Sequence, residues 1–192
     1  MKSPREWLVG RVLGFLLSCS VSCAALGAEI VGRVTGLADG DTITVLVDGH
    51  DMVKVRLAGI DAPEKAQPFG AASKKHLSDR VFGRTVTVEW MKRDKYGRVI
   101  GRVLLDGDDV CLEQVRAGLA WHYKAYAKEQ AKTQRLAYSA AEEQARLDKV
   151  GLWSLPNQVP PWEFRHRGSD HMNKAPCSTT SGSTSARTGS HV

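Results

Sequence analysis

The chain has 192 residues, of which 42% are hydrophobic and 25% charged, so it can bury one core of ordinary size but is short for two. Its formal net charge of +6 speeds encounters with polyanions such as nucleic acid, although the same charge is equally compatible with a role in solubility alone. We therefore expect one folded domain, and charge by itself does not select a partner.

The first 28 residues have the pattern of a signal peptide. Lys2, Arg5 and Arg11 precede an apolar stretch that ends in small residues at Ala28. The stretch is shorter than the roughly 20 residues that a spanning helix needs, so cleavage near Ala28 is favoured over a membrane anchor. An exported protein, secreted or periplasmic, is expected.

The cysteines leave one alternative open. The residues before Cys19 and Cys23 resemble, imperfectly, the sites at which bacterial lipoproteins are cleaved and acylated, so a lipid anchor through either cysteine is the alternative. Cleavage near residue 28 would leave Cys111, in a segment that looks packed, and Cys177, in a polar tail. We expect two independent thiols rather than a disulfide. The absence of a Cys-x-x-Cys motif argues against a zinc ribbon.

Apolar residues alternate with polar ones from residue 29 to residue 105, which is typical of half-buried strands. The pattern predicts five strands, marked by Ile30 and Val34, Ile43 to Val47, Val53 to Leu57, Val86 and Val88, and Val99 to Leu105. Gly and Asp occupy the turns between several of them. Short strands with hairpin turns favour a small, closed or nearly closed barrel.

Three segments have helical spacing: residues 70–80, 110–117 and about 132–150. The first is expected to lie across an end of the barrel, and Gly151 is a natural stop for the third. The folded domain is therefore expected to cover residues 29–156.

The C-terminal part changes in composition. Prolines between Pro156 and Pro161 interrupt regular structure, and the aromatic segment after them is expected to fold back as a clasp over residues 157–167. Residues 168–192 are rich in Ser, Thr and Gly with almost no large apolar side chains, so a disordered tail is expected there.

Acidic residues lie at the ends of two predicted strands. Asp39 and Asp41 share a turn, and Asp61 and Glu64 follow a later strand. If the two strands are neighbours, the carboxylates meet in one cleft, where they repel one another unless a cation is present. Oxygen ligands favour calcium or magnesium. The first pair alone is more often a simple turn, and it is the second pair that makes a metal site the better interpretation.

Arg56 and Arg98 each lie in or beside a strand with an apolar face, and each needs an anionic partner. Either arginine can form a structural ion pair. A guanidinium also matches phosphate oxygens and the charge of a pentacoordinate transition state. Two arginines beside an acidic metal site favour phosphoryl chemistry.

Three motifs follow one another at residues 39–43, 56–64 and 94–98, with weaker matches at 118–121 and 151–154. With these motifs the chain resembles the staphylococcal nuclease (thermonuclease) family over about residues 29–156. The resemblance implies an α+β, mainly β fold: a five-stranded OB-fold barrel with three helices. It implies a calcium-dependent, sugar-nonspecific nuclease whose substrates are DNA and RNA and whose products carry 3′-phosphate ends. A monomer is expected.

The resemblance also implies a ligand set for Ca²⁺. Asp41 and Asp61 would bind through carboxylates and Ala62 through its backbone carbonyl, and Asp39 would support them without touching the ion. The family prototype has Thr where this chain has Ala62, which matters little if only the carbonyl binds.

Catalytic roles follow from the same resemblance. Glu64 would orient or deprotonate the attacking water. Arg56 and Arg98 would clamp the phosphate and stabilise developing charge, and Arg98 could also assist the leaving oxygen. The segment after Glu64 is shorter than the lysine-rich loop of the prototype.

Substrate contacts are expected from Lys95 and Tyr96, which match the family's contacts to a terminal phosphate and nucleotide. Tyr123 and Tyr126 fall where the family places an aromatic against a base, although packing explains both equally well. His122, in the same stretch, is better explained by packing than by ligation.

Two other classes of function compete with a nuclease. One is a nucleic-acid-binding OB module with weak or no catalysis, and the other is a calcium-stabilised adhesion or structural domain. Decay of catalysis should have removed Arg56, Glu64 or Arg98, and all three are present. The paired arginines have no evident purpose in an adhesion domain. The nuclease is therefore the leading hypothesis.

Overall fold

The computed structural model describes residues 28–172, so the expected signal peptide except Ala28, together with Cys177 and most of the expected tail, lies outside the described residues. The strands are β1 (Ala28–Leu37), β2 (Thr42–Val47), β3 (Asp51–Leu57), β4 (Ile60–Asp61), β5 (Thr85–Arg93), β6 (Val99–Leu105), β7 (Asp108–Asp109) and β8 (Trp121–His122). The helices are α1 (Gly70–Val81), α2 (Val110–Arg116), α3 (Lys132–Leu147) and α4 (Pro161–Met172), with short 3₁₀ turns at Lys124–Glu129 and Gly151–Ser154.

The larger sheet closes on itself. Its strands run in the order β3-β2-β1-β5-β6-β7, each antiparallel to its neighbours, and β3 pairs in parallel with β6 through Val55 and Val99. Strands β1, β2, β3, β5 and β6 therefore form a closed mixed barrel, and the predicted α+β, mainly β fold of OB type is confirmed. A separate ladder joins β4 to β8.

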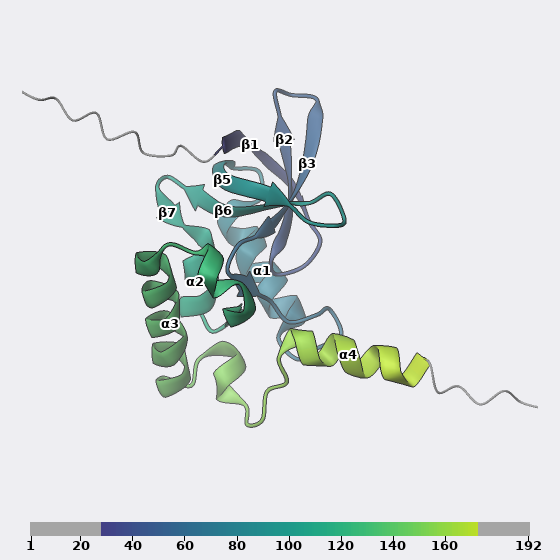
Figure 1. The fold of residues 1–192 in the computed structure, drawn as a ribbon, viewed down its shortest axis with the longest axis vertical. Coiled ribbons are helices and arrows are strands. Elements are labelled where there is room, and N and C mark those ends of the chain that lie inside the picture. Colours follow the sequence, from purple (N-terminus) through teal and green to yellow (C-terminus); the bar gives the residue numbers. More distant parts are fainter. Residues whose placement is uncertain (1–27, 173–192) are drawn as a thin grey trace, which may run out of the picture.

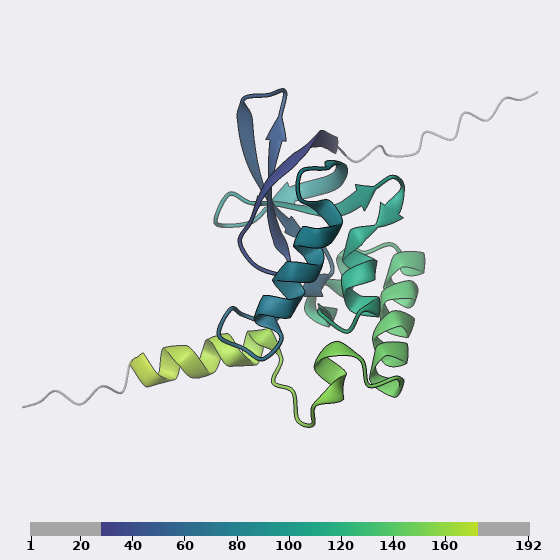
Figure 2. The same ribbon diagram turned by 180° about the vertical axis from the view of Figure 1, so that it is seen from behind.

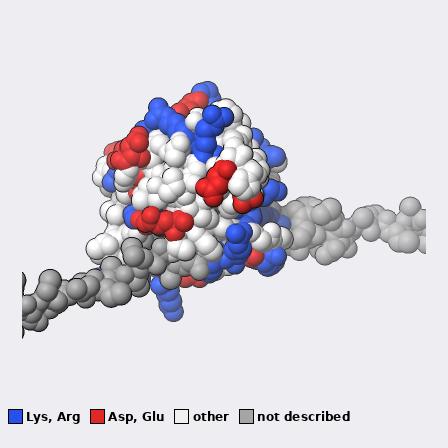
Figure 3. Space-filling view, turned by 90° about the horizontal axis from the view of Figure 1, so that it is seen from above, with Lys and Arg blue, Asp and Glu red and all other residues white. Residues whose placement is uncertain are grey.

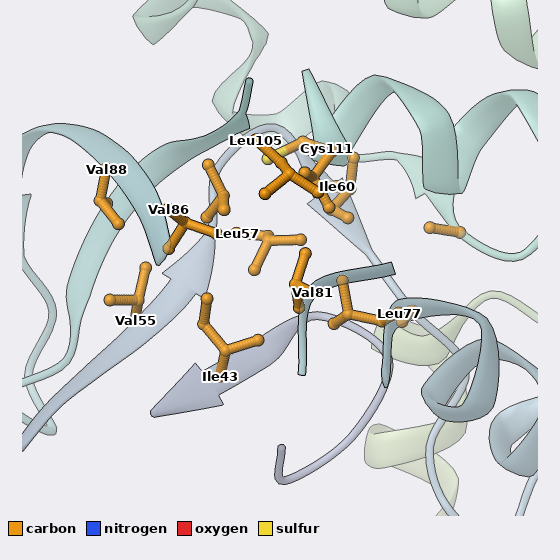
Figure 4. Packing of buried hydrophobic residues seen from close by; sticks show 14 of the residues in the cluster. Ile43, Val55, Leu57, Ile60, Leu77, Val81, Val86, Val88, Leu105 and Cys111 are labelled. Carbon is orange, nitrogen blue, oxygen red and sulfur yellow. The ribbon is translucent and has the colours of Figure 1, made fainter. Parts of the chain in front are cut away.

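The core lies inside the barrel because the period-two pattern sends alternate side chains inward. Val99, Gly101, Val103 and Leu105 of β6 are buried, and the three residues that alternate with them are half-buried. Figure 4 shows side chains from the strands meeting those of α1, among them Leu77 and Val81. Since β2 and β3 are fixed by this packing, the residues at their ends are fixed as well.

The three predicted helices are confirmed as α1, α2 and α3, with ends within a few residues of the expected ones. They gather beside and below the barrel in Figure 1, and α2 lies against α3. Cys111 of α2 is fully buried, and burial raises the pKa of its thiol.

The sequence pattern gave no sign of a fourth helix. α4 begins at Pro161, the last of the prolines expected to interrupt regular structure, and ends at Met172, past the expected start of the tail at residue 168. Its first turn lies near the loop between β4 and α1, and the rest extends away from the barrel, as Figures 1 and 2 both show. Among residues 28–172, no helix is both long and apolar enough to cross a bilayer.

Candidate active site

The pairing of β2 with β3 sets the position of the first carboxylate. Thr42 at the start of β2 is the partner of Arg56 in β3, and the backbone amide of Leu57 donates to the carbonyl of Asp41 at 2.8 Å. Asp41 is thereby held beside the end of β3. The predicted condition that these two strands are neighbours is met.

Arg56 joins two carboxylates that lie 20 residues apart in the sequence. Its Nη1 lies 2.7 Å from Oδ1 of Asp41, and its Nη2 lies 2.6 Å from Oδ1 of Asp61. The side chain of Asp61 is 0% exposed and that of Arg56 is 18% exposed. Burial opposes the charge of Arg56, but the two carboxylates raise its pKa above the usual value. Distant residues thus form one charged cluster.

Asp41 is surrounded by donors. Besides Arg56, the hydroxyl of Thr42 donates to its Oδ1 at 2.9 Å and the amide of Ala62 donates to its Oδ2 at 2.9 Å. Burial raises the pKa of Asp41 to about 7; Arg56 opposes this rise, while the charge of Asp39 adds to it. A cation placed at this carboxylate would favour its ionised form.

The turn before Asp41 is fixed by buried contacts. Oδ1 of Asp39 accepts from the amide of Asp41 at 3.1 Å, and Nε2 of Gln114 donates to the carbonyl of Gly40 at 2.8 Å. A Cβ at Gly40 would lie 1.9 Å from Oγ of Ser73, so a residue without a side chain is needed at this close approach. Asp39 therefore acts on the backbone of the turn.

Glu64 lies at the edge of the cluster. Its amide donates to Oε1 of Gln67 at 2.8 Å, and Nε2 of Gln67 donates to the carbonyl of Val159 at 2.9 Å. Its carboxylate accepts from Nη1 of Arg165 at 2.7 Å, and Nη2 of the same arginine lies 2.8 Å from Oδ2 of Asp61. The C-terminal segment thus reaches the cluster directly.

Arg98 does not contact the cluster. Its guanidinium is paired with Asp94 at 2.7 Å. Because Arg56 is the partner of Ile100 in the parallel β3–β6 ladder, and Arg98 lies two residues before Ile100, strand alternation places Arg98 on the same face as Arg56. The structure brings the two arginines to one face without joining them.

Lys95 and Tyr96 lie on the turn that precedes β6. Tyr96 is 71% exposed, and the ammonium of Lys95 lies 5.1 Å and the guanidinium of Arg98 5.5 Å from the centre of its ring. With Lys54 and Arg93, Tyr96 and Arg98 line a groove beside β3. An aromatic ring among cations is suited to a nucleotide.

Tyr123 lies closer to the cluster than Tyr126 does. Burial first, and then the charge of Asp61, raises the pKa of Tyr123. The ring of Tyr123 lies 5.3 Å from that of Trp162 and 5.2 Å from that of Tyr126, which is half exposed. His122 is buried, and its Nε2 lies 2.9 Å from Oε1 of Gln130. These contacts are consistent with a packing role for His122.

The donor set of the cluster suits a hard cation. Asp41 and Asp61 offer carboxylate oxygens, which lie on either side of the guanidinium of Arg56. The backbone of Ala62 is next to them, because its amide donates to Asp41. Within residues 28–172, no three His, Cys, Asp or Glu side chains are grouped closely enough to hold a metal by themselves. A calcium ion would therefore need backbone or water oxygens in addition, which Ca²⁺ accepts readily.

The motifs do not reveal three side chains that the structure places at the cluster: Gln67, Gln114 and Arg165. Gln67 and Gln114 carry no pattern that distinguishes them from surface glutamines. A signal for Arg165 did exist, because it lies in the aromatic segment expected to fold back onto the domain.

A closed barrel with paired carboxylates and an arginine at its strand ends defines an OB-fold protein with a site suited to phosphate esters. The family model described as staphylococcal nuclease homologue matches residues 54–155. The chain belongs to the staphylococcal nuclease family.

Relatives of similar length are described as nucleases. A protein described as an uncharacterized endonuclease in Escherichia coli is 43% identical over 154 residues, which are 80% of this chain and 94% of the relative. A similarly described protein of Haemophilus influenzae is 39% identical over 157 residues, 82% and 85% of the two chains. A micrococcal nuclease of Shigella flexneri is 37% identical over 155 residues, 76% and 86% of the two chains.

Proposed function

We propose that this chain is an exported, calcium-dependent nuclease that hydrolyses phosphodiester bonds of DNA and RNA and leaves 3′-phosphate ends. The observation that carries the proposal is the bridge from Arg56 to both Asp41 and Asp61. The bridge brings two carboxylates and a guanidinium together, and this supports the proposal because metal-assisted phosphoryl transfer needs oxygen ligands and a phosphate-binding group side by side.

Asp41, Asp61 and the carbonyl of Ala62 would hold Ca²⁺, with Asp39 keeping the turn in place. When bound, the ion supplies charge neutralisation at the phosphate and a lower pKa for a bound water. The buried surroundings of Asp61 strengthen electrostatic interactions with any ion or phosphate placed there.

The guanidinium of Arg56 has five N–H donors, and its two carboxylate partners do not use all of them. Arg56 would bind the phosphate with the remaining donors, on the exposed edge of its side chain. Glu64, at the solvent side of Asp61, would accept a hydrogen bond or a proton from the attacking water and so orient the water toward phosphorus. Arg98, on the same face as Arg56, would stabilise charge on the departing oxygen.

Local groups rather than overall charge would hold the substrate. On the face shown in Figure 3, Lys and Arg are interspersed with Asp and Glu and do not form one continuous patch. Lys95 and Tyr96 would contact a terminal phosphate and nucleotide, and Tyr123 with Tyr126 would stack on a base. A monomer suffices, because one chain supplies all these groups.

Export is proposed on the residue pattern before Ala28, with lipid attachment at Cys19 or Cys23 as the alternative. The mass of the protein recovered from its natural host distinguishes the two forms. A chain that still begins at Met1 would contradict both.

The test of the activity is to incubate the purified protein with plasmid DNA and with RNA, in Ca²⁺ or in excess chelator. We expect both substrates to be cut only with Ca²⁺, and the ends to be substrates for a 3′-phosphatase. Binding of nucleic acid without cleavage would instead support the OB binding module, and cleavage in chelator would contradict the role of the cation.

A further inference from the structure

The segment that reaches the cluster belongs to α4 and is attached near its first turn. The carbonyl of Val159 accepts from Gln67, and the ring of Trp162 lies 5.3 Å from that of Tyr123 and 6.4 Å from that of Trp121. The C-terminal part of α4 extends away from the barrel, as Figures 1 and 2 show. The contacts of this segment include those of Val159, Trp162 and Arg165, and these three residues lie outside the hydrophobic core of the barrel, so the segment can leave the surface without disturbing that core.

Arg165 binds the carboxylate oxygens on which the proposed reaction depends. Its Nη2 lies 2.8 Å from Oδ2 of Asp61 and its Nη1 lies 2.7 Å from Oε1 of Glu64. Arg56 already donates to Oδ1 of Asp61. Both carboxylate oxygens of Asp61 therefore pair with guanidinium groups. Glu64, the carboxylate expected to act on water, is paired with Arg165 as well.

We propose that Arg165 is an internal competitor of the divalent cation, so that docking of α4 closes the site and binding of Ca²⁺ releases the helix. The proposal rests on the proposed function, because it takes Asp61 as a cation ligand. A calcium ion sits about 2.4 Å from a carboxylate oxygen. An ion at Oδ2 of Asp61 would be in contact with the guanidinium of Arg165, and the two positive charges would repel each other.

The strength of the contact suits a reversible switch. Asp61 is fully buried, but the side chain of Arg165 is 43% exposed, so solvent weakens its ion pairs. The hydrogen bonds to Asp61 and Glu64 nevertheless outweigh burial and raise the pKa of Arg165, so its charge persists at any physiological pH.

Linkage makes the effect reciprocal. If Ca²⁺ weakens docking of α4, docking weakens binding of Ca²⁺ by the same factor. While α4 is docked, Arg165 occupies one acceptor position on Oε1 of Glu64, so fewer positions are left for the attacking water. Docked protein is therefore the less active form, and the cation, rather than a second protein, opens it.

The test measures Ca²⁺ binding by calorimetry in the absence of nucleic acid, on the full chain and three variants. Arg165→Gln removes the competing guanidinium. Trp162→Ala loosens α4 without changing any charge, and Arg116→Gln removes an exposed arginine of α2 as a matched control. We expect Ca²⁺ to bind about fivefold more tightly to Arg165→Gln, more tightly to Trp162→Ala, and unchanged to the control.

A second readout follows the helix itself. Hydrogen exchange of the amides of residues 162–172 should speed up when Ca²⁺ is added to the parent protein, and should already be fast in Arg165→Gln without it. Equal or weaker Ca²⁺ affinity in Arg165→Gln, or exchange that Ca²⁺ leaves unchanged, would overturn the competition while the proposed nuclease stands. Absence of Ca²⁺ binding in every variant would overturn both.

Discussion

Arg56 Nη2 lies 2.6 Å from Oδ1 of Asp61, a carboxylate with no exposed surface. The same guanidinium reaches Asp41 at 2.7 Å, so Arg56 pairs with two buried acids, of which Asp61 has Arg165 as a second partner. A buried charge that loses its partner is costly. The cluster is therefore a stability element of the fold as well as the candidate active site, and the two roles can be separated by experiment.

Arg56→Gln should destabilise the protein by about 3 kcal/mol in the absence of metal, because it leaves Asp41 and Asp61 without their shared partner. Urea unfolding measures the change. Addition of Ca²⁺ should restore part of the loss, since the ion would replace the missing positive charge. A variant as stable as the parent would show that Arg56 is not needed to balance the acids.

Arg98→Ala should lower cleavage about a hundredfold, because a donor to developing charge is lost. Its free energy of unfolding should change by only about 1 kcal/mol, because Asp94, whose side chain is 14% exposed, keeps the backbone amides of Tyr96 and Arg98 as donors when the guanidinium is removed. Initial rates on plasmid DNA and urea unfolding measure the two effects, with Arg116→Ala as the control. Cleavage at the parent rate would remove Arg98 from the reaction.

Glu64→Gln should reduce kcat at least about a hundredfold and leave unfolding nearly unchanged, because the amide keeps the shape of Glu64 but accepts a proton poorly. Glu143→Gln, on the exposed face of α3, is the matched control and should cut at the parent rate. Unchanged kcat in Glu64→Gln would show that another group handles the water.

Ca²⁺ affinity should fall as pH falls through about 7, because the ion requires Asp41 in its ionised form and burial raises the pKa of Asp41 to about 7. The stability of the metal-free protein depends on pH in the opposite sense. A raised folded-state pKa stabilises the metal-free protein below the unfolded value of 3.8, and this stabilisation is lost as pH rises through about 7.

Calorimetric titrations with Ca²⁺ at about pH 6 and about pH 8 check the first expectation, and Asp41→Asn provides the reference. In that variant the step near neutral pH should disappear. Equal affinity at both pH values in the parent would mean that Asp41 is already ionised well below pH 7.

Gln114→Leu should destabilise the protein by about 2 kcal/mol and weaken Ca²⁺ binding, because the carbonyl of Gly40 loses its buried donor. The turn that carries Asp39 and Asp41 would then be less firmly held. Gln144→Leu, at an exposed position of α3, is the control. Loss of stability without any change in Ca²⁺ affinity would show that the hold of Gln114 on the turn does not contribute to Ca²⁺ binding.

Much of the fold was predictable because its signals are local. Alternation in β2 and β6, turn residues between strands, and the helical spacing of α1 to α3 each lie within a few consecutive residues. The helix α4 was missed because prolines and a polar sequence mask it, and its attachment depends on contacts with Trp121 and Tyr123.

For the candidate site, the sequence by itself determined which acids and arginines flank the barrel strands, because the residue types and their spacing are written in the chain. Only the tertiary structure decided that Arg56 spans Asp41 and Asp61, that Gln114 holds the turn at Gly40, and that Arg98 stands apart with Asp94. It also brought Arg165 to Asp61 across 104 residues. Such contacts depend on the register of strands and the path of a distant helix, and no local pattern carries that information.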